Sequence, residues 1–69
     1  MKLSARNQIK GRVTAVRFGT VMAEVVIDIG GGNELVAAIT RISAEALGLT
    51  TATEVTAVIK STEIIIATE

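Results

Sequence analysis

Two residue types that carry much of protein chemistry are missing from this chain of 69 residues, which contains no cysteine and no histidine. Without thiols there are no disulfide bonds, cysteine nucleophiles or zinc–thiolate sites, and without imidazole there is no histidine acid–base catalysis. These absences exclude a large part of the enzyme repertoire.

Long apolar runs are lacking as well. Residues 1–18 are basic and alternating, unlike a signal peptide, and no apolar stretch approaches the roughly 20 residues that span a bilayer. We therefore expect a cytoplasmic protein without a membrane segment.

Aromatic residues are scarce, since Phe18 is the only one, yet 49% of the residues are hydrophobic. Valine, isoleucine, leucine and alanine carry that content, and these types fill β cores and subunit interfaces. A domain of this size buries only about 60% of the surface that its unfolded chain exposes, which leaves it marginally stable. The composition therefore favours self-association.

Positive charge is concentrated near the N-terminus, although the net charge is zero. Five of the seven basic residues precede the first acidic residue, Glu24, and they are Lys2, Arg6, Lys10, Arg12 and Arg17. This segment attracts anions locally. The alternative is a solvated strand face whose cations pair with the later carboxylates.

Alternation of apolar and polar residues predicts the first strand, from Ile9 through Ala15. At Val16 and Phe18 the apolar residues change parity. A bulge or a strong twist would rotate the strand in this way, and Gly11 is the residue that we expect to permit it.

The next two strands form a predicted hairpin. After a turn centred on Gly19, residues 21–29 alternate cleanly, residues 30–33 make a glycine-rich loop, and residues 35–39 resume the alternation. The three glycines could suggest a phosphate loop, but no Gly-Lys-Ser or Gly-Lys-Thr follows them and no helix is predicted at Asn33.

A short helix is predicted next, with Ser43 as N-cap, Glu45 in the first turn, Gly48 at the C-terminal stop and Ile42 stapled to Leu47.

Two further strands are predicted, the fourth over residues 55–59 and the fifth over residues 62–68. The fifth contains three consecutive isoleucines and is apolar on both faces, so we expect a neighbouring subunit to cover it. The order predicts an all-β fold, a five-stranded OB-like barrel with one short helix between strands 3 and 4, and a single domain over residues 1–69.

Two polar clusters interrupt these strands, residues 4–8 and residues 60–62. They offer guanidinium, ammonium, hydroxyl and amide donors but no carboxylate or imidazole, so they can hold an oxyanion without hydrolysing it. The alternative is an ordinary polar terminus and an ordinary hairpin turn. A Ser61–Lys60 nucleophile pair is disfavoured, because adjacent strand residues point to opposite faces.

The clusters Ser4-Ala5-Arg6-Asn7-Gln8, followed by Lys10-Gly11, and Val58-Ile59-Lys60-Ser61-Thr62 resemble the signatures of molbindins, the small Mop-type molybdate-binding proteins. The resemblance covers essentially the whole chain. Within the chain it also includes the glycine-rich turn and the helix. The same pattern resembles the related molybdate-binding domains of molybdate regulators and transport ATPases.

The resemblance implies a non-enzymatic homo-oligomer, a hexamer built as a trimer of dimers, that binds molybdate or tungstate at subunit interfaces. A storage role is expected, since no DNA-binding or ATPase domain accompanies the module. The ligands that it implies are Ser4, Ala5, Arg6, Lys60 and Ser61, with Asn7 in support. A second oxyanion site is assigned to the turn residues Gly19, Thr20, Val21 and Met22.

Single-stranded nucleic-acid binding is the main alternative, because OB-type barrels commonly bind such strands and the N-terminal segment is basic. A single aromatic residue and zero net charge argue against it, because stacking platforms and electrostatic attraction would both be weak. A purely structural assembly module is the other alternative.

Overall fold

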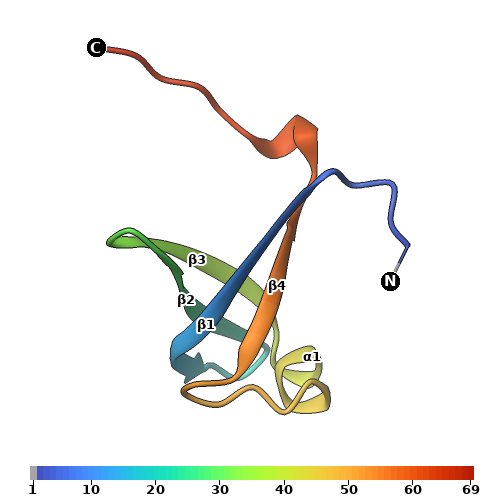
Figure 1. The fold of residues 1–69 in the computed structure, drawn as a ribbon. Helices are drawn as coiled ribbons and strands as arrows, with labels where there is room; N and C mark the ends of the chain where they lie inside the picture. Colours follow the sequence, from blue (N-terminus) through green and yellow to red (C-terminus); the bar gives the residue numbers. More distant parts are fainter. Residues whose placement is uncertain (1) are drawn as a thin grey trace.

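The computed structural model describes residues 2–69 and shows an all-β fold with one short α-helix (Figure 1). In chain order the elements are β1 (Asn7–Phe18), β2 (Met22–Gly30), β3 (Asn33–Thr40), α1 (Arg41–Ala46), β4 (Glu54–Ile59) and the 3-10 turn η1 (Ser61–Glu63). The predicted helix between the third and fourth strands is confirmed. No helix within residues 2–69 is long and apolar enough to cross a membrane.

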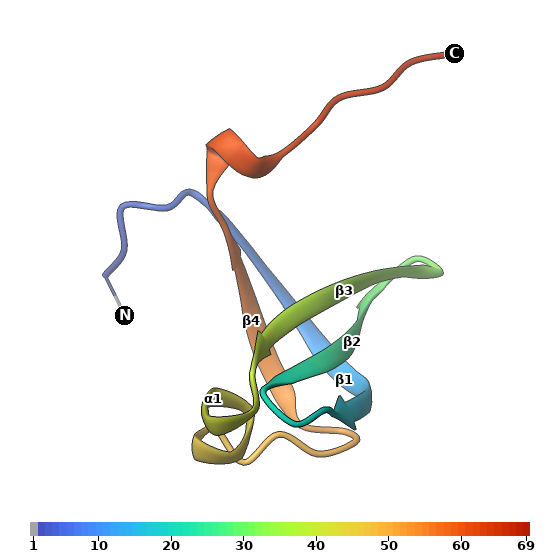
Figure 2. The same ribbon diagram turned by 180° about the vertical axis from the view of Figure 1, so that it is seen from behind.

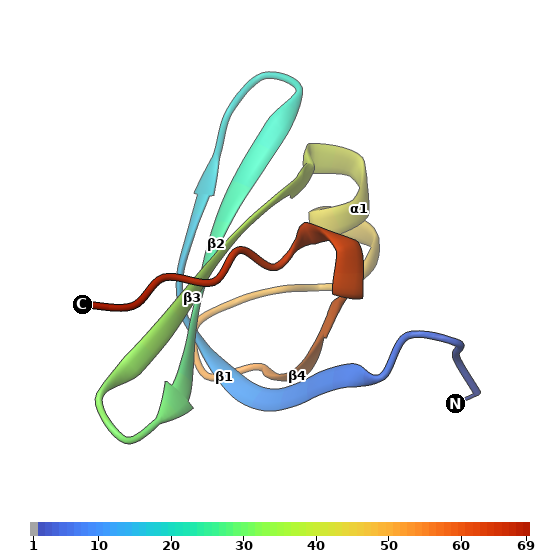
Figure 3. The same cartoon turned by 90° about the horizontal axis from the view of Figure 1, so that it is seen from above.

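The strands form one antiparallel sheet in the order β3-β2-β1-β4. The long strand β1 pairs through its second half with β2 and through its first half with β4. The sheet bends strongly, so that the edge strands β3 and β4 both face the apolar interior (Figure 3). The sheet is open and does not close into a barrel between these edges.

The predicted irregularity in β1 is confirmed, but its predicted position was wrong. Val13 pairs with Ile27 and Ala15 pairs with Val26, so Thr14 is the extra residue of a β-bulge. This bulge explains why the apolar residues of β1 change parity after Ala15.

Gly11 is not part of the bulge, but it allows β1 to pack closely against β2. A Cβ atom at this position would lie 2.5 Å from Cγ2 of Ile27 and 2.8 Å from the carbonyl oxygen of Asp28. Only glycine therefore lets β1 approach β2 at this point.

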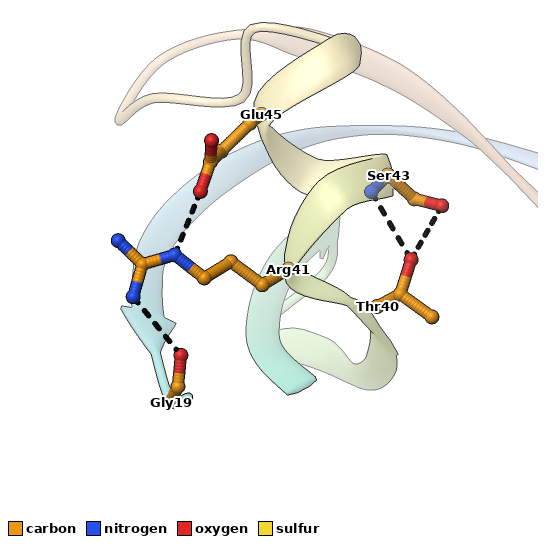
Figure 4. Close-up of polar contacts among 5 residues, drawn as sticks. All are labelled: Gly19, Thr40, Arg41, Ser43 and Glu45. Carbon is orange, nitrogen blue, oxygen red and sulfur yellow. Dashed lines mark hydrogen bonds and ion pairs between the residues drawn. The ribbon is translucent and has the colours of Figure 1, made fainter. Parts of the chain in front are cut away.

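The helix begins three residues before its predicted start, because Thr40 supplies the capping hydroxyl (Figure 4). The amide of Ser43 donates to Oγ1 of Thr40 at 3.1 Å. Ser43 therefore lies inside the first turn and is not the N-cap. The predicted staple is also wrong, since Ile42 and Leu47 are 80% and 67% exposed.

The predicted stop at Gly48 is confirmed, and its φ of +64° is the left-handed conformation that glycine tolerates. The Gly48 amide donates to the Glu45 carbonyl at 3.0 Å, and the Leu49 amide donates to the Ala44 carbonyl at 3.2 Å. This pair of bonds is a Schellman motif, and it brings Leu49 into the core beside Ala44.

The core of the single chain is small. The buried residues are Val13, Ala23, Val25, Ile27, Ala44 and Leu49. The inward-facing residues of β3 and β4 are only half buried, because they line an apolar groove of about 410 Å³ that is open to solvent.

The predicted fifth strand is absent from the described residues, 2–69, and the sheet has four strands. After η1 the chain leaves the body in an extended conformation (Figures 1 and 2). Ile65 and Ile66 are 92% and 80% exposed. A strand needs a neighbour for its backbone hydrogen bonds, and in the isolated chain this segment has none beside it.

Candidate functional site

The two polar clusters at opposite ends of the sequence meet at one end of the β1–β4 ladder (Figures 1 and 2). The ladder begins with the pairing of Asn7 with Ile59. Residues 4–6 therefore enter β1 beside the point where residues 60–61 leave β4. The antiparallel register of these two strands thus brings the two polar clusters together.

Asn7 connects the two clusters directly. Its Nδ2 donates to the carbonyl oxygen of Ile59 at 3.3 Å and to Oγ of Ser61 at 3.4 Å. On the N-terminal side, Nε2 of Gln8 donates to the carbonyl of Ala5 at 2.9 Å. The side-chain amide of Asn7 thus joins the two clusters, and that of Gln8 holds the segment before β1.

Arg6 and Lys60 are the cations of this site, and both side chains are exposed. Within residues 2–69, neither of them forms an ion pair or a side-chain hydrogen bond. Ser61 begins η1, in which the Glu63 amide donates to the Lys60 carbonyl at 2.9 Å. The site therefore combines two unpaired cations with hydroxyl donors.

The predicted second site lies in the β1–β2 loop, at the opposite end of the molecule beside α1. The Gly19 amide already donates to the Met22 carbonyl at 2.7 Å, and the Arg41 amide donates to the Val21 carbonyl at 2.8 Å. Within the described residues, the amides of Thr20 and Val21 donate to no backbone carbonyl outside the strands. Those two amides are the donors that this loop still offers.

Sequence reasoning missed Arg41, which fixes this loop (Figure 4). Its Nη1 donates to the Gly19 carbonyl at 3.2 Å, its Nε pairs with Oε1 of Glu45 at 2.7 Å, and its guanidinium lies 5.5 Å from the centre of the Phe18 ring. The spacing of four residues between Arg41 and Glu45 was the available signal.

Arg12 lies on β1 outside both sites and pairs with Glu54 at 3.2 Å. This confirms, for Arg12, the alternative that N-terminal cations pair with later carboxylates. Both side chains are mostly exposed, at 62% and 80%, so the pair contributes little to stability.

Comparison with protein families gives a match over most of the chain. The model of the TOBE domain matches residues 3–66. The molybdenum-pterin-binding protein 3 of Clostridium pasteurianum is 53% identical over 66 residues, which cover 96% of this chain and 97% of that protein.

Solved structures share the fold. A molybdate-binding protein from Sporomusa ovata superposes with a TM-score of 0.92 at 44% identity, covering 99% of this chain and all of that one. The cytoplasmic molybdate-binding protein ModG, in a form with molybdate bound, superposes with a TM-score of 0.85 at 51% identity, covering 88% of this chain and 43% of that one.

The fold is thus the OB-like fold shared with small molybdate-binding proteins, with an open four-stranded sheet in the single chain. The chain belongs to the TOBE domain family, among the molbindins, as the two polar signatures indicated.

Proposed function

We propose that the protein binds molybdate or tungstate at the meeting point of residues 4–7 and 60–61, within a homo-oligomer. The observation that carries this proposal is the bridge from Asn7 to Ile59 and Ser61, which joins two donor clusters more than 50 residues apart. Relatives named for molybdenum-pterin or molybdate binding support the choice of anion.

The proposed ligands are the hydroxyls of Ser4 and Ser61, the Ala5 backbone and the charged groups of Arg6 and Lys60. Two positive charges balance one dianion, and charge-assisted hydrogen bonds hold it in place. Asn7 positions Ser61. The clusters lie on the surface of the single chain, where water weakens such contacts, so we infer that a neighbouring subunit covers the anion.

A second anion site is proposed at the β1–β2 loop, residues 19–22. The Thr20 and Val21 amides are its donors, while Arg41 holds the Gly19 carbonyl and so fixes the loop. We propose a hexamer as the assembly, with anions at both kinds of site.

The proposed role is molybdenum storage and homeostasis in the cytoplasm, with residues 1–69 acting as one binding module. Catalysis is not proposed, because the two clusters supply cations and neutral donors without a general base. The similarity to ModG, named as a cytoplasmic molybdate-binding protein, supports this role.

Nucleic-acid binding gains no support from the structure. The Arg41 guanidinium lies against the ring of Phe18, the one aromatic residue, so this ring is a poor platform for a base.

Calorimetric titration with molybdate, tungstate, sulfate and phosphate tests the proposed function. We expect saturable binding of molybdate and tungstate and much weaker binding of sulfate and phosphate. Equal binding of all four anions would indicate general electrostatic attraction and would contradict a specific site.

A further inference from the structure

The four-residue turn between β1 and β2, residues 19–22, is not closed by the usual hydrogen bond of a β-turn. In a closed β-turn the carbonyl of the first residue accepts from the amide of the fourth. Within residues 2–69 the Met22 amide does not donate to the Gly19 carbonyl, which accepts instead from Nη1 of Arg41 at 3.2 Å. A side chain from the first residue of α1 therefore replaces the closing bond of the turn (Figure 4).

The Arg41 side chain is held in this position by two further contacts. Its Nε pairs with Oε1 of Glu45 at 2.7 Å, and its guanidinium lies 5.5 Å from the centre of the Phe18 ring. The backbone amide of Arg41 also donates to the Val21 carbonyl of the same turn, at 2.8 Å. Because the guanidinium is planar, these contacts fix the direction in which Nη1 donates. Arg41 thus presents a rigid donor to the turn, although its side chain is 47% exposed.

The bond from Arg41 to Gly19 also sets the direction of the next backbone amide. The peptide bond between Gly19 and Thr20 is trans, so its carbonyl and its N–H point in opposite directions. Because Arg41 holds the carbonyl, the Thr20 N–H points away from the guanidinium. Rotation of this peptide group would replace the N–H donor with a carbonyl oxygen, which accepts hydrogen bonds and repels an anion.

We propose that Arg41 is a positioning residue of the second anion site, which keeps the Thr20 N–H turned toward the anion by holding the Gly19 carbonyl. This inference rests on the second site of the proposed function, at residues 19–22. Arg41 does not bind the anion itself, because the donor that it orients points away from it and Glu45 balances its charge. The effect of Arg41 on binding is therefore one of orientation, and it should depend little on salt.

Molybdate calorimetry in the Arg6→Ala protein tests this role, because binding at the first site is weakened there. The test variant adds Arg41→Ala together with Glu45→Gln, so the bond to Gly19 is lost while the summed charge of the pair stays zero. We expect the test variant to bind molybdate about tenfold more weakly than the Arg6→Ala parent, the change expected from loss of one hydrogen bond to a charged group. The loss should persist at high salt.

Two further variants of the same parent provide a rescue and a control. Arg41→Lys keeps a long cationic donor for the Gly19 carbonyl, so it should bind molybdate more tightly than the test variant. Arg17→Ala removes a positive charge two residues before Gly19, from an exposed side chain that forms no ion pair within residues 2–69. Its loss should change the affinity only slightly, and less so at high salt.

Three results would overturn the proposal. The first is a test variant that binds molybdate as tightly as its parent, or no more weakly than Arg17→Ala does. The second is an Arg41→Lys variant that binds no more tightly than the test variant. The third is loss of first-site molybdate or of the oligomer in native mass spectrometry when Arg41 is changed and Arg6 is intact, because Arg41 would then act through the whole fold.

The Arg6→Ala parent separates this test from that of the proposed function. If the wild type binds molybdate and the parent binds none, the second site itself is absent, and the role of Arg41 is overturned with it. If the parent binds molybdate and the test variant binds equally well, only the role of Arg41 is overturned and the second site remains.

Discussion

Arg6 and Lys60 carry the positive charge at the proposed anion site, and within residues 2–69 neither is neutralised by a carboxylate. A hydrogen bond to a charged group is worth about 1.5–3 kcal/mol, and about 1.4 kcal/mol is a tenfold change in affinity. Arg6→Ala or Lys60→Ala should therefore weaken molybdate binding at least tenfold in calorimetry, while the oligomer persists. Ser61→Ala should cost less.

Arg12→Ala is the matched control for these substitutions. Arg12 lies on the same strand, but it pairs with Glu54 and its side chain is 62% exposed. Its loss should change affinity only slightly, and less so at high salt. If Arg12→Ala weakened binding as much as Arg6→Ala, the assigned site would be wrong.

At Gly11, even the addition of a methyl group should lower the free energy of unfolding. Its substitution by alanine would put a methyl group 2.5 Å from Cγ2 of Ile27 and 2.8 Å from a backbone oxygen. Overpacking of this kind costs about 1–3 kcal/mol of the free energy of unfolding, measurable by urea denaturation. The nearby substitution Lys10→Ala, at an exposed position of the same strand that forms no ion pair within residues 2–69, serves as the control. An unchanged unfolding midpoint for Gly11→Ala would show that the strands can separate here without cost.

At the scale of elements, the strands were predictable where one face is buried. The alternation in residues 21–29 and 35–39 defined β2 and β3, because a period of two distinguishes the core face from the solvent face. The helix start was misplaced by three residues. Thr40 and Ser43 are both good caps, and the choice depends on where the extended backbone of β3 ends.

The bulge and the fifth strand show two further limits of sequence reasoning. A parity change shows that a bulge exists, but the position of the extra residue depends on the pairing with β2. The apolar residues of segment 62–68 indicate that other residues must bury them. A single sequence does not show which sheet edge the segment pairs with. The apposition of residues 4–7 with 60–61 within one chain likewise depends on strand register, which the sequence alone does not show. The resemblance to molbindins implied only that both clusters contribute ligands.

The cap of α1 gives a prediction at this scale. Thr40→Ala removes the oxygen that accepts from the Ser43 amide, so it should lower the free energy of unfolding by about 0.5–2 kcal/mol. Ser43→Ala keeps that amide bond and should cost less. Denaturant unfolding of both variants measures this difference. A larger loss of unfolding free energy for Ser43→Ala than for Thr40→Ala would indicate that Ser43 is the N-cap.

For the whole molecule, the balance between a small core and a large exposed apolar surface points to assembly. Among residues 2–69, six are buried in the single chain, whereas Val21, Val36, Ile42, Leu47, Ile65 and Ile66 are each more than half exposed. Such a surface is typical of subunit interfaces. Folding and self-association should therefore be coupled.

Molybdate should stabilise the assembled protein. If the anion binds the native oligomer and not the unfolded chain, a hundredfold excess over the dissociation constant adds about 2.7 kcal/mol of stability. Thermal unfolding should show a higher midpoint with molybdate and a smaller shift with sulfate. Equal shifts with both anions would indicate nonspecific screening.

The central claim is that molybdate is held between subunits, and native mass spectrometry of the protein titrated with molybdate tests it most directly. We predict that molybdate is retained by the oligomer, that any monomer in the same spectrum carries none, and that Arg6→Ala oligomers retain fewer molybdate ions than the wild type without dissociating. A folded monomer that retains molybdate, or a wild-type oligomer that retains none at saturating molybdate, would contradict the account.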